Sequence, residues 1–253
     1  MRATLTVVLG VALALAAVPG ARGQTAAPEA QGDFYTEPVG LPLPQEGWDP
    51  LTTVVPVKAG EQPVANLKVA GGHWESRISD ASMAVKINCI VSLGMWPSAE
   101  SKVGQRCVAA GYAAVRPYPP EELPLVERWK GQEVSLQLVP EAAWNLTGRQ
   151  TLVFWLRVSN LKVLGAEPKV GLVARSGDKV IYSQGSGTAI LLAALAHGDT
   201  WQEVRVPLDQ IKPQQADLAK FPLEQILGVG ISLQINTPEV FTEVVWVDGL
   251  RFE

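Results

Sequence analysis

Apolar and polar residues alternate along much of this chain in short runs, which is the pattern of β-strands. In the run 133–139, Val134, Leu136 and Leu138 are apolar and the residues between them are polar. A period of two places one set of side chains on a buried face and the other toward solvent. Further strand-like runs, separated by turn residues, cover 84–93, 106–115, 151–158, 169–174, 179–182, 200–208, 227–235 and 244–252. Short strands at such intervals predict an all-β fold, a β-sandwich of the jelly-roll type, with an N-terminal extension.

One segment, Thr188–Ala196, departs from this alternation because it consists mainly of Ala and Leu. Its intrinsic propensity favours a helix. Its place between two strand-like runs favours a strand, and we expect a strand here.

The first 23 residues have the features of a secretory signal peptide. Arg2 supplies a positive start, Leu5–Val18 is almost entirely apolar, and the small residues Ala21 and Gly23 stand at the −3 and −1 positions of a cleavage site. A membrane anchor is the alternative, but the apolar run is shorter than the roughly 18–20 residues that a spanning helix needs. We therefore expect a secreted or periplasmic protein with no membrane insertion after cleavage.

Residues 24–80 read as a linker or arm that contains short strands, and 81–253 as the jelly-roll domain. The arm is rich in Pro and Gly, and Gly40–Pro44 cannot be helical because each Pro removes an N–H donor and restricts the residue before it. Short strands are expected at 51–57 and 64–70.

The charge of the chain argues against nucleic acid as a partner. The formal net charge is −4, and it becomes −6 once the first 23 residues, with two Arg and no acid, are removed. No run of Lys and Arg provides the basic surface that nucleic acids or anionic lipids require.

The only two cysteines, Cys89 and Cys107, can pair if the protein is exported. We expect a disulfide between them, and two separate buried thiols are the alternative.

From about residue 85 the order of elements resembles the galactose-binding-like jelly rolls, which include several families of carbohydrate-binding modules. The resemblance covers about two-thirds of the chain, and it is carried by five short motifs in the expected order: Val103–Cys107, Trp144–Gly148, Leu152–Leu156, Thr200–Leu208 and Val245–Phe252. It implies the fold more specifically than it implies a ligand.

The resemblance also implies a role for Asp248, since the corresponding residue of many such modules helps to bind a structural calcium ion. Asn88 is the only candidate for a second ligand in the matching early strand, Ile87–Leu93, which contains no Asp or Glu. Calcium usually takes several oxygen ligands, including carboxylates. The alternative is that Asp248 caps a turn or accepts hydrogen bonds from backbone amides, and otherwise we expect no cofactor.

Eight tryptophans are the candidates for a ligand site, because a rigid indole offers a flat platform to the C–H face of a sugar. We assign those within strand patterns, Trp155, Trp201 and Trp246, to the core. Those in loops or at strand ends are the predicted ligand-binding residues, together with Arg128 as a hydrogen-bond donor: Trp74, Trp96, Trp129 and Trp144. The alternative for each is that it fills the core.

No catalytic pattern stands out in the sequence. Glu121 and Glu122 are adjacent acids in a Pro-rich segment, and His73 and His197 lie far apart. Glycoside hydrolysis needs two carboxylates that face each other across a cleft. We therefore predict an exported, non-catalytic protein that binds a polysaccharide or other glycan. A structural or protein-interaction domain without a sugar ligand is the alternative, and a jelly-roll lyase or hydrolase is a third reading.

Overall fold

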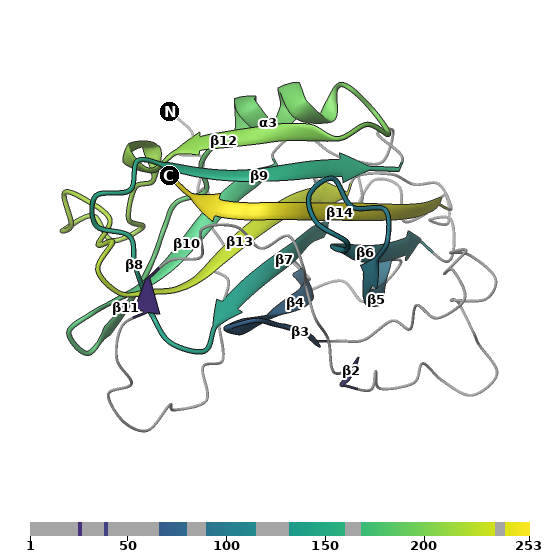
Figure 1. Ribbon diagram of the computed structural model, residues 1–253. Helices are drawn as coiled ribbons and strands as arrows, with labels where there is room; N and C mark the ends of the chain where they lie inside the picture. The colour runs from purple at the N-terminus through teal and green to yellow at the C-terminus, as the bar shows by residue number, and fades with distance from the viewer. Residues whose placement is uncertain are drawn as a thin grey trace, which may run out of the picture.

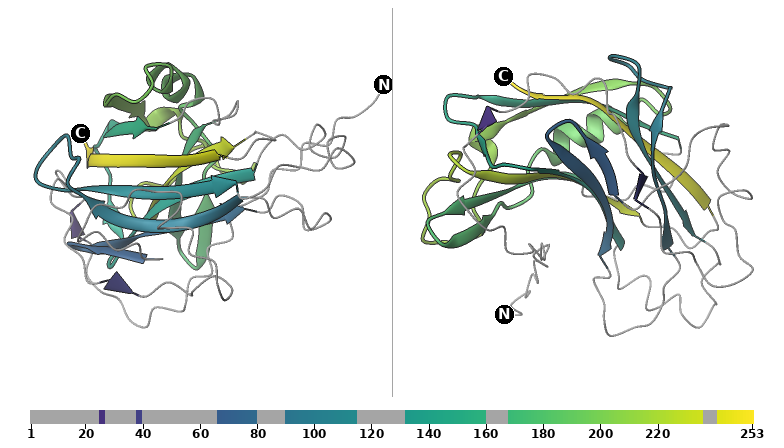
Figure 2. Two further views of the ribbon diagram at one scale, coloured as in Figure 1. Left: turned by 90° about the vertical axis from the view of Figure 1, so that its right-hand side faces the viewer. Right: turned by 60° about the horizontal axis from the view of Figure 1, so that its bottom comes forward.

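The computed structural model consists mainly of β-strands arranged in two facing sheets (Figures 1 and 2). Apart from one short parallel pair, β1 with β8, neighbouring strands are antiparallel. The predicted β-sandwich is therefore confirmed. The structure describes residues 25–26, 38–39, 66–79, 90–114, 132–159, 168–235 and 241–253.

The larger sheet has nine strands, in the order β1-β8-β13-β7-β4-β3-β2, with β10 paired to β13 and β11 to β10. Its strands are β1 (Thr25–Ala26), β2 (Pro38–Val39), β3 (Asn66–Val69), β4 (Gly72–Ser79), β7 (Gln132–Pro140), β8 (Trp144–Asn145), β10 (Lys169–Ser176), β11 (Lys179–Tyr182) and β13 (Ile226–Ile235). The five-stranded sheet has the order β12-β9-β14-β6-β5. Its strands are β5 (Ile90–Ser98), β6 (Cys107–Ala114), β9 (Thr151–Val158), β12 (Gln202–Pro207) and β14 (Phe241–Phe252).

The core lies between the two sheets and is built from every second residue of the central strands. Phe154 of β9 and Leu138 of β7 are fully buried in it. Trp144 and Phe252 close one end with their rings edge to face, 5.8 Å between centroids. Burying each large apolar side chain contributes about 1.5–3 kcal/mol, so this alternation is the main source of stability.

The expected strand at 188–196 is wrong, because Thr188–Leu195 forms the helix α3. The helix packs mainly on β12 (Figure 1) and directs Leu191 and Leu195 into the core. A helix satisfies its own backbone hydrogen bonds, so it can cover apolar strands without joining a sheet. Gly187 starts it with φ of 77°, and a Cβ there would lie 3.1 Å from Val206 Cγ2.

Part of the predicted arm belongs to the sandwich. The expected strand at 64–70 is present as β3, and the β3–β4 hairpin pairs with β7 in the nine-stranded sheet. The signal peptide and the expected strand at 51–57 lie outside the described residues, and the division of the chain at 23 and 80 stays a prediction. Within the part of the chain that the structure describes, no helix is long and apolar enough to cross a membrane.

The predicted disulfide is not present: Cys107 is a buried thiol, and its Sγ donates to the Glu100 carbonyl at 3.6 Å. Cys107 pairs with Ser98 at one end of the β5–β6 hairpin, whereas Cys89 precedes Ile90 at the other end of β5. A nine-residue strand separates the two ends by roughly 26 Å, and a disulfide needs Cα atoms within about 7 Å. Cys89 itself lies outside the described residues.

Candidate functional site

Three of the four tryptophans expected at the surface are buried. Trp74, Trp96 and Trp144 are 0%, 3% and 3% exposed. Trp74 is on the inner face of β4, and Trp144 packs on Phe252, so both fill the core. The expectation that these three indoles are exposed to a ligand is therefore wrong. Trp129 and Arg128 lie outside the described residues.

Two of the tryptophans assigned to the core are instead partly exposed, namely Trp155 of β9 and Trp201 just before β12. The ring of Trp155 is covered by the Lys102 ammonium, 4.8 Å from its centroid. Trp246 is 9% exposed, and the Arg157 guanidinium lies 4.5 Å above its ring. Cation–π contacts therefore already occupy a face of Trp155 and of Trp246.

Charged side chains on the outer face of the five-stranded sheet form ion pairs with one another. Arg157 binds Asp199 at 2.6 Å and Glu100 at 2.8 Å. The hydrogen bond to Asp199 is the main cause that raises the pKa of Arg157, and partial burial opposes it.

A second group of ion pairs lies on the same face. Arg251 binds Glu203 at 2.9 Å and Glu253 at 2.8 Å, and Arg205 also contacts both carboxylates. Hydrogen bonds from Arg251 and then Arg205 lower the pKa of Glu253. Since these charged groups are satisfied by one another, they are poorly placed to recognise a ligand.

Asp248 is fully buried and anchors the loop between β5 and β6. Its Oδ2 accepts hydrogen bonds from the backbone N–H groups of Lys102 and Val103, each at 2.7 Å, and its Oδ1 accepts one from Gly249 at 2.7 Å. This is the backbone-amide alternative considered for Asp248. Both oxygens face N–H groups, whose positive hydrogens would meet a cation, so this half of the predicted calcium pair does not fit the ion. Asn88, the other half of the predicted pair, lies outside the described residues.

The outer face of the nine-stranded sheet carries polar side chains that are screened from solvent. Ser135, Gln137 and Ser232 are 5%, 6% and 7% exposed. On the neighbouring strand β4, His73 Nε2 and Glu75 Oε1 are hydrogen-bonded at 2.9 Å. The low exposure of the central groups leaves little room for a ligand on them.

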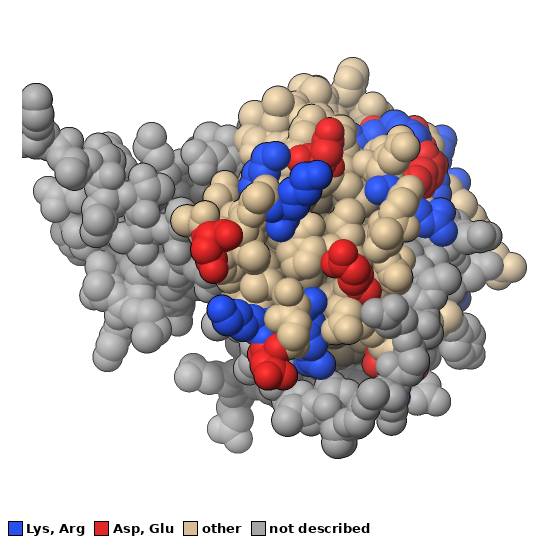
Figure 3. Space-filling model, turned by 90° about the vertical axis from the view of Figure 1, so that its left-hand side faces the viewer, with Lys and Arg blue, Asp and Glu red and all other residues tan. Residues whose placement is uncertain are grey.

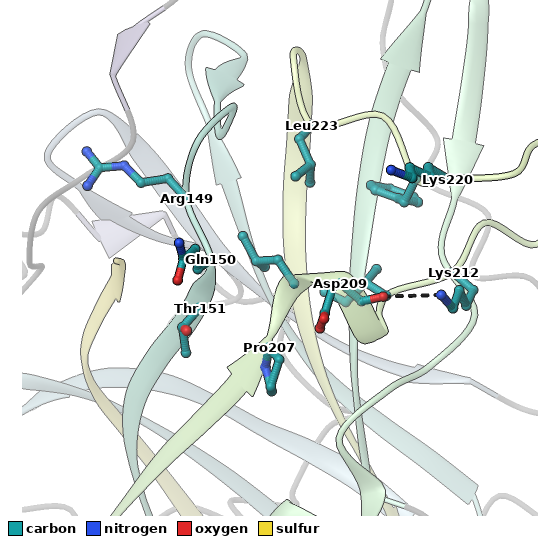
Figure 4. Close-up of a pocket in the computed structure, with 11 residues that line it drawn as sticks. Arg149, Gln150, Thr151, Pro207, Asp209, Lys212, Lys220 and Leu223 are labelled. Carbon is teal, nitrogen blue, oxygen red and sulfur yellow. Dashed lines mark hydrogen bonds between the residues drawn. The ribbon is translucent and has the colours of Figure 1, made fainter.

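An open pocket lies at one end of the sandwich, and we call it the end pocket (Figure 4). Its volume is about 630 Å³, within the range of small-molecule sites. Three segments that are distant in sequence line it: 149–151 at the start of β9, 207–212 from the end of β12 onward, and 220–223 before β13. Figure 3 looks onto this end of the molecule, where acidic and basic side chains surround an uncharged central area.

Backbone hydrogen bonds hold these three segments together. Gln150 accepts a bond from the Leu208 N–H at 2.8 Å, and its own N–H donates to the Glu253 carbonyl at 2.6 Å. The Leu146 N–H donates to the Leu223 carbonyl at 2.8 Å. The pocket is therefore preformed by the sandwich framework.

The end pocket combines an apolar floor with a polar rim. Leu208, Ile211 and Phe221 are buried beneath it at 4%, 2% and 7% exposure, and all three pack in the core. Rim donors and acceptors come from Arg149, Gln150, Thr151, Asp209, Lys212 and Lys220. In Figure 4, Arg149, Gln150 and Thr151 stand on one side of the pocket, and Lys212 and Lys220 on the other.

The rim cations have no carboxylate partner within the part of the chain that the structure describes. No ion pair among the described residues involves Arg149, Lys212 or Lys220. Lys212 Nζ donates to the backbone carbonyl of Asp209 at 3.2 Å. Asp209 is the single carboxylate of the lining, so three cations face one anion.

Sequence reasoning missed the end pocket entirely. Its residues come from three separate turns and belong to common types, with no motif that joins them. The only local signal is that Lys212 and Lys220 stand in a Pro-containing stretch between strands, where exposed turns are expected.

Comparison with known proteins gives no family assignment from sequence. No protein-family model and no curated protein matches the chain. Solved structures do match, and several of them are carbohydrate-binding modules with β-sandwich folds, the class that the five motifs resemble.

Two modules and one enzyme illustrate these matches. One is a structure of carbohydrate-binding modules from the β-sandwich superfamily, with 14% identity and a TM-score of 0.41, covering 72% of this chain and 57% of that one. Another is the family 11 carbohydrate-binding module from Clostridium thermocellum, with 8% identity and a TM-score of 0.41 over 71% and 87% of the two chains. A third is the β-1,2-glucanase from Parabacteroides distasonis, with 11% identity and a TM-score of 0.40 over 71% and 22%. At these values the function has to be argued from this chain's own residues.

Proposed function

We propose that this protein is a non-catalytic carbohydrate-binding protein and that the end pocket receives the glycan. The observation that carries the proposal is the apolar floor of Leu208, Ile211 and Phe221 beneath a hydrogen-bonding rim. A sugar ring needs both, because its C–H faces pack on apolar groups while its hydroxyls need donors and acceptors. Pockets that are apolar with a few well-placed polar groups are the usual form of small-molecule sites.

The composition of the rim supports binding rather than hydrolysis. Asp209 is the one carboxylate of the lining, and the common glycosidase mechanisms need two on opposite sides of the bond. Gln150 and Thr151 can exchange hydrogen bonds with hydroxyls but supply no general acid at neutral pH.

A protein-interaction domain without a sugar ligand has less support. Among the described residues, the exposed large hydrophobic side chains are Val103 and Leu192, which lie on separate elements. A protein-binding surface usually needs a contiguous apolar patch.

The predicted signal peptide completes the proposal. A secreted or periplasmic protein meets polysaccharides outside the cytoplasm, and no membrane insertion is expected after cleavage. The net charge of −4 argues against nucleic acid as the partner.

The proposal is tested by screening the purified protein on a polysaccharide panel, with affinity electrophoresis and calorimetry as readouts. Gln150→Trp fills the pocket mouth with a bulky side chain at an exposed position and should abolish binding. Lys179→Trp, at the exposed β10–β11 turn, is the matched control and should bind normally. Binding that survives Gln150→Trp would place the glycan elsewhere, and release of reducing ends from any bound polysaccharide would show an enzyme.

A further inference from the structure

We infer that the end pocket selects an anionic saccharide, one that carries a carboxylate or sulfate group. This inference rests on the proposed function and specifies its ligand class. It is carried by the uncompensated cations of the rim, Arg149, Lys212 and Lys220.

The rim differs from the outer face of the five-stranded sheet in how its cations are partnered. Among the described residues it gathers three unpaired cations about one pocket, whereas Arg175 and Lys179 are unpaired cations that do not line it. On the outer face of the five-stranded sheet, Arg157, Arg205 and Arg251 each contact two carboxylates. At the end pocket, by contrast, Arg149 and Lys220 take part in no ion pair among the described residues, and Lys212 contacts only a backbone carbonyl. The chain has more acids than bases, 25 against 21, yet among the described residues no carboxylate forms an ion pair with these three cations.

The cations flank the pocket, so an anionic group at its mouth has a cation within reach on either side. Arg149 stands on one side, with its guanidinium directed outward, and the two lysines stand on the other (Figure 4). An anionic group bound here gains charge-assisted hydrogen bonds, which are about twice as strong as neutral ones. Asp209 lies at the same rim and can accept a bond from a hydroxyl. A sugar that carries one anionic group and several hydroxyls can therefore bind both to the cations and to Asp209.

Matched pairs of ligands test the inference, because each pair differs only in charge. Oligogalacturonate is compared with its methyl ester, and dextran sulfate with dextran, by calorimetry at low salt. We expect at least one anionic member to bind about 10-fold or more tightly than its neutral counterpart, with the preference shrinking as salt is raised. The uronate and sulfate pairs identify which anion is recognised.

Variants that each remove one charge show whether the preference for anionic ligands arises at the end pocket. Arg149→Met and Lys220→Met keep the apolar stem and remove the charge, so each should lose most of the anionic preference. Arg175→Met and Lys179→Met remove exposed cations outside the pocket and should keep it. Circular dichroism confirms that each variant is folded.

The possible failures are distinguishable. If neutral and anionic glycans bind equally and Gln150→Trp abolishes both, the inference is wrong and the proposed function stands. If polyglutamate binds as tightly as the anionic sugars and competes with them, while no neutral sugar binds, the pocket is a general anion site and both are wrong. If no saccharide binds, both are also wrong.

Discussion

The buried carboxylate of Asp248 offers the most direct test of how this sandwich is held together. Asp248→Asn keeps the shape of the side chain but replaces one oxygen by an NH₂ group. The best orientation leaves the amide oxygen facing the N–H groups of Lys102 and Val103. The NH₂ group then faces the N–H of Gly249, which loses its acceptor.

The change in the free energy of unfolding can be worked out from these three hydrogen bonds. A buried N–H without an acceptor costs about 1–3 kcal/mol. The two remaining bonds become neutral and lose about half their strength, roughly 1 kcal/mol each. A neutral amide is easier to bury than a carboxylate, which offsets about 1 kcal/mol. We therefore expect the free energy of unfolding to fall by about 2–4 kcal/mol, a large part of the typical 5–15 kcal/mol.

Urea denaturation followed by tryptophan fluorescence and circular dichroism measures this change. At about 2–4 °C per kcal/mol, the melting temperature should fall by roughly 5–15 °C. Asp178→Asn, in the exposed turn between β10 and β11, is the control and should stay within about 0.5 kcal/mol of the parent. A similarly small effect of Asp248→Asn would refute the assignment of these hydrogen bonds.

Three further predictions concern calcium, alkaline pH and the start of α3. Because the Asp248 oxygens face N–H groups, the melting temperature should be the same in excess calcium and in EDTA; a rise with calcium would contradict this. Burial raises the pKa of Tyr112, although its bond to Ser76 opposes the shift, so Tyr112 contributes stability below pH 10 that is lost above it. The loss is about 1.4 kcal/mol per pH unit, and urea titrations should find it smaller in Tyr112→Phe. Gly187→Ala should lower the free energy of unfolding by about 2–3 kcal/mol, because the added methyl group crowds Val206 and because Ala disfavours a positive φ. Gly177→Ala has open space around it and should show only the backbone cost in the same denaturation assay.

Much of the fold could be predicted because alternation reports directly on burial. The strands at 151–158 and 179–182 agree with β9 and β11 at both ends; β9 has buried residues at every second position, and the short β11 buries Ile181. The segment that became α3 has no such alternation, and there the balance between propensity and context was misjudged. The disulfide was misjudged for a different reason, because only the hairpin register shows which residues of β5 and β6 are opposite one another.

The site could not be predicted because exposure depends on what lies over a residue. Trp74 looks like a surface residue beside two glycines, yet β4 turns its indole into the core. Trp155 lies in an apolar strand, yet it is on the outer face beneath Lys102. The end pocket depends on three turns that meet only after both sheets have formed.

The position of β14 has a consequence for biogenesis. This strand is the latest of the sandwich in chain order, yet it lies in the middle of the five-stranded sheet, between β9 and β6 (Figure 1). Nascent chains that lack residues 241–252 cannot join the two halves of that sheet, so premature folding during synthesis is disfavoured. If the predicted signal peptide directs this chain to a translocon, such a delay favours export, because the five-stranded sheet cannot close before its last strand has been made.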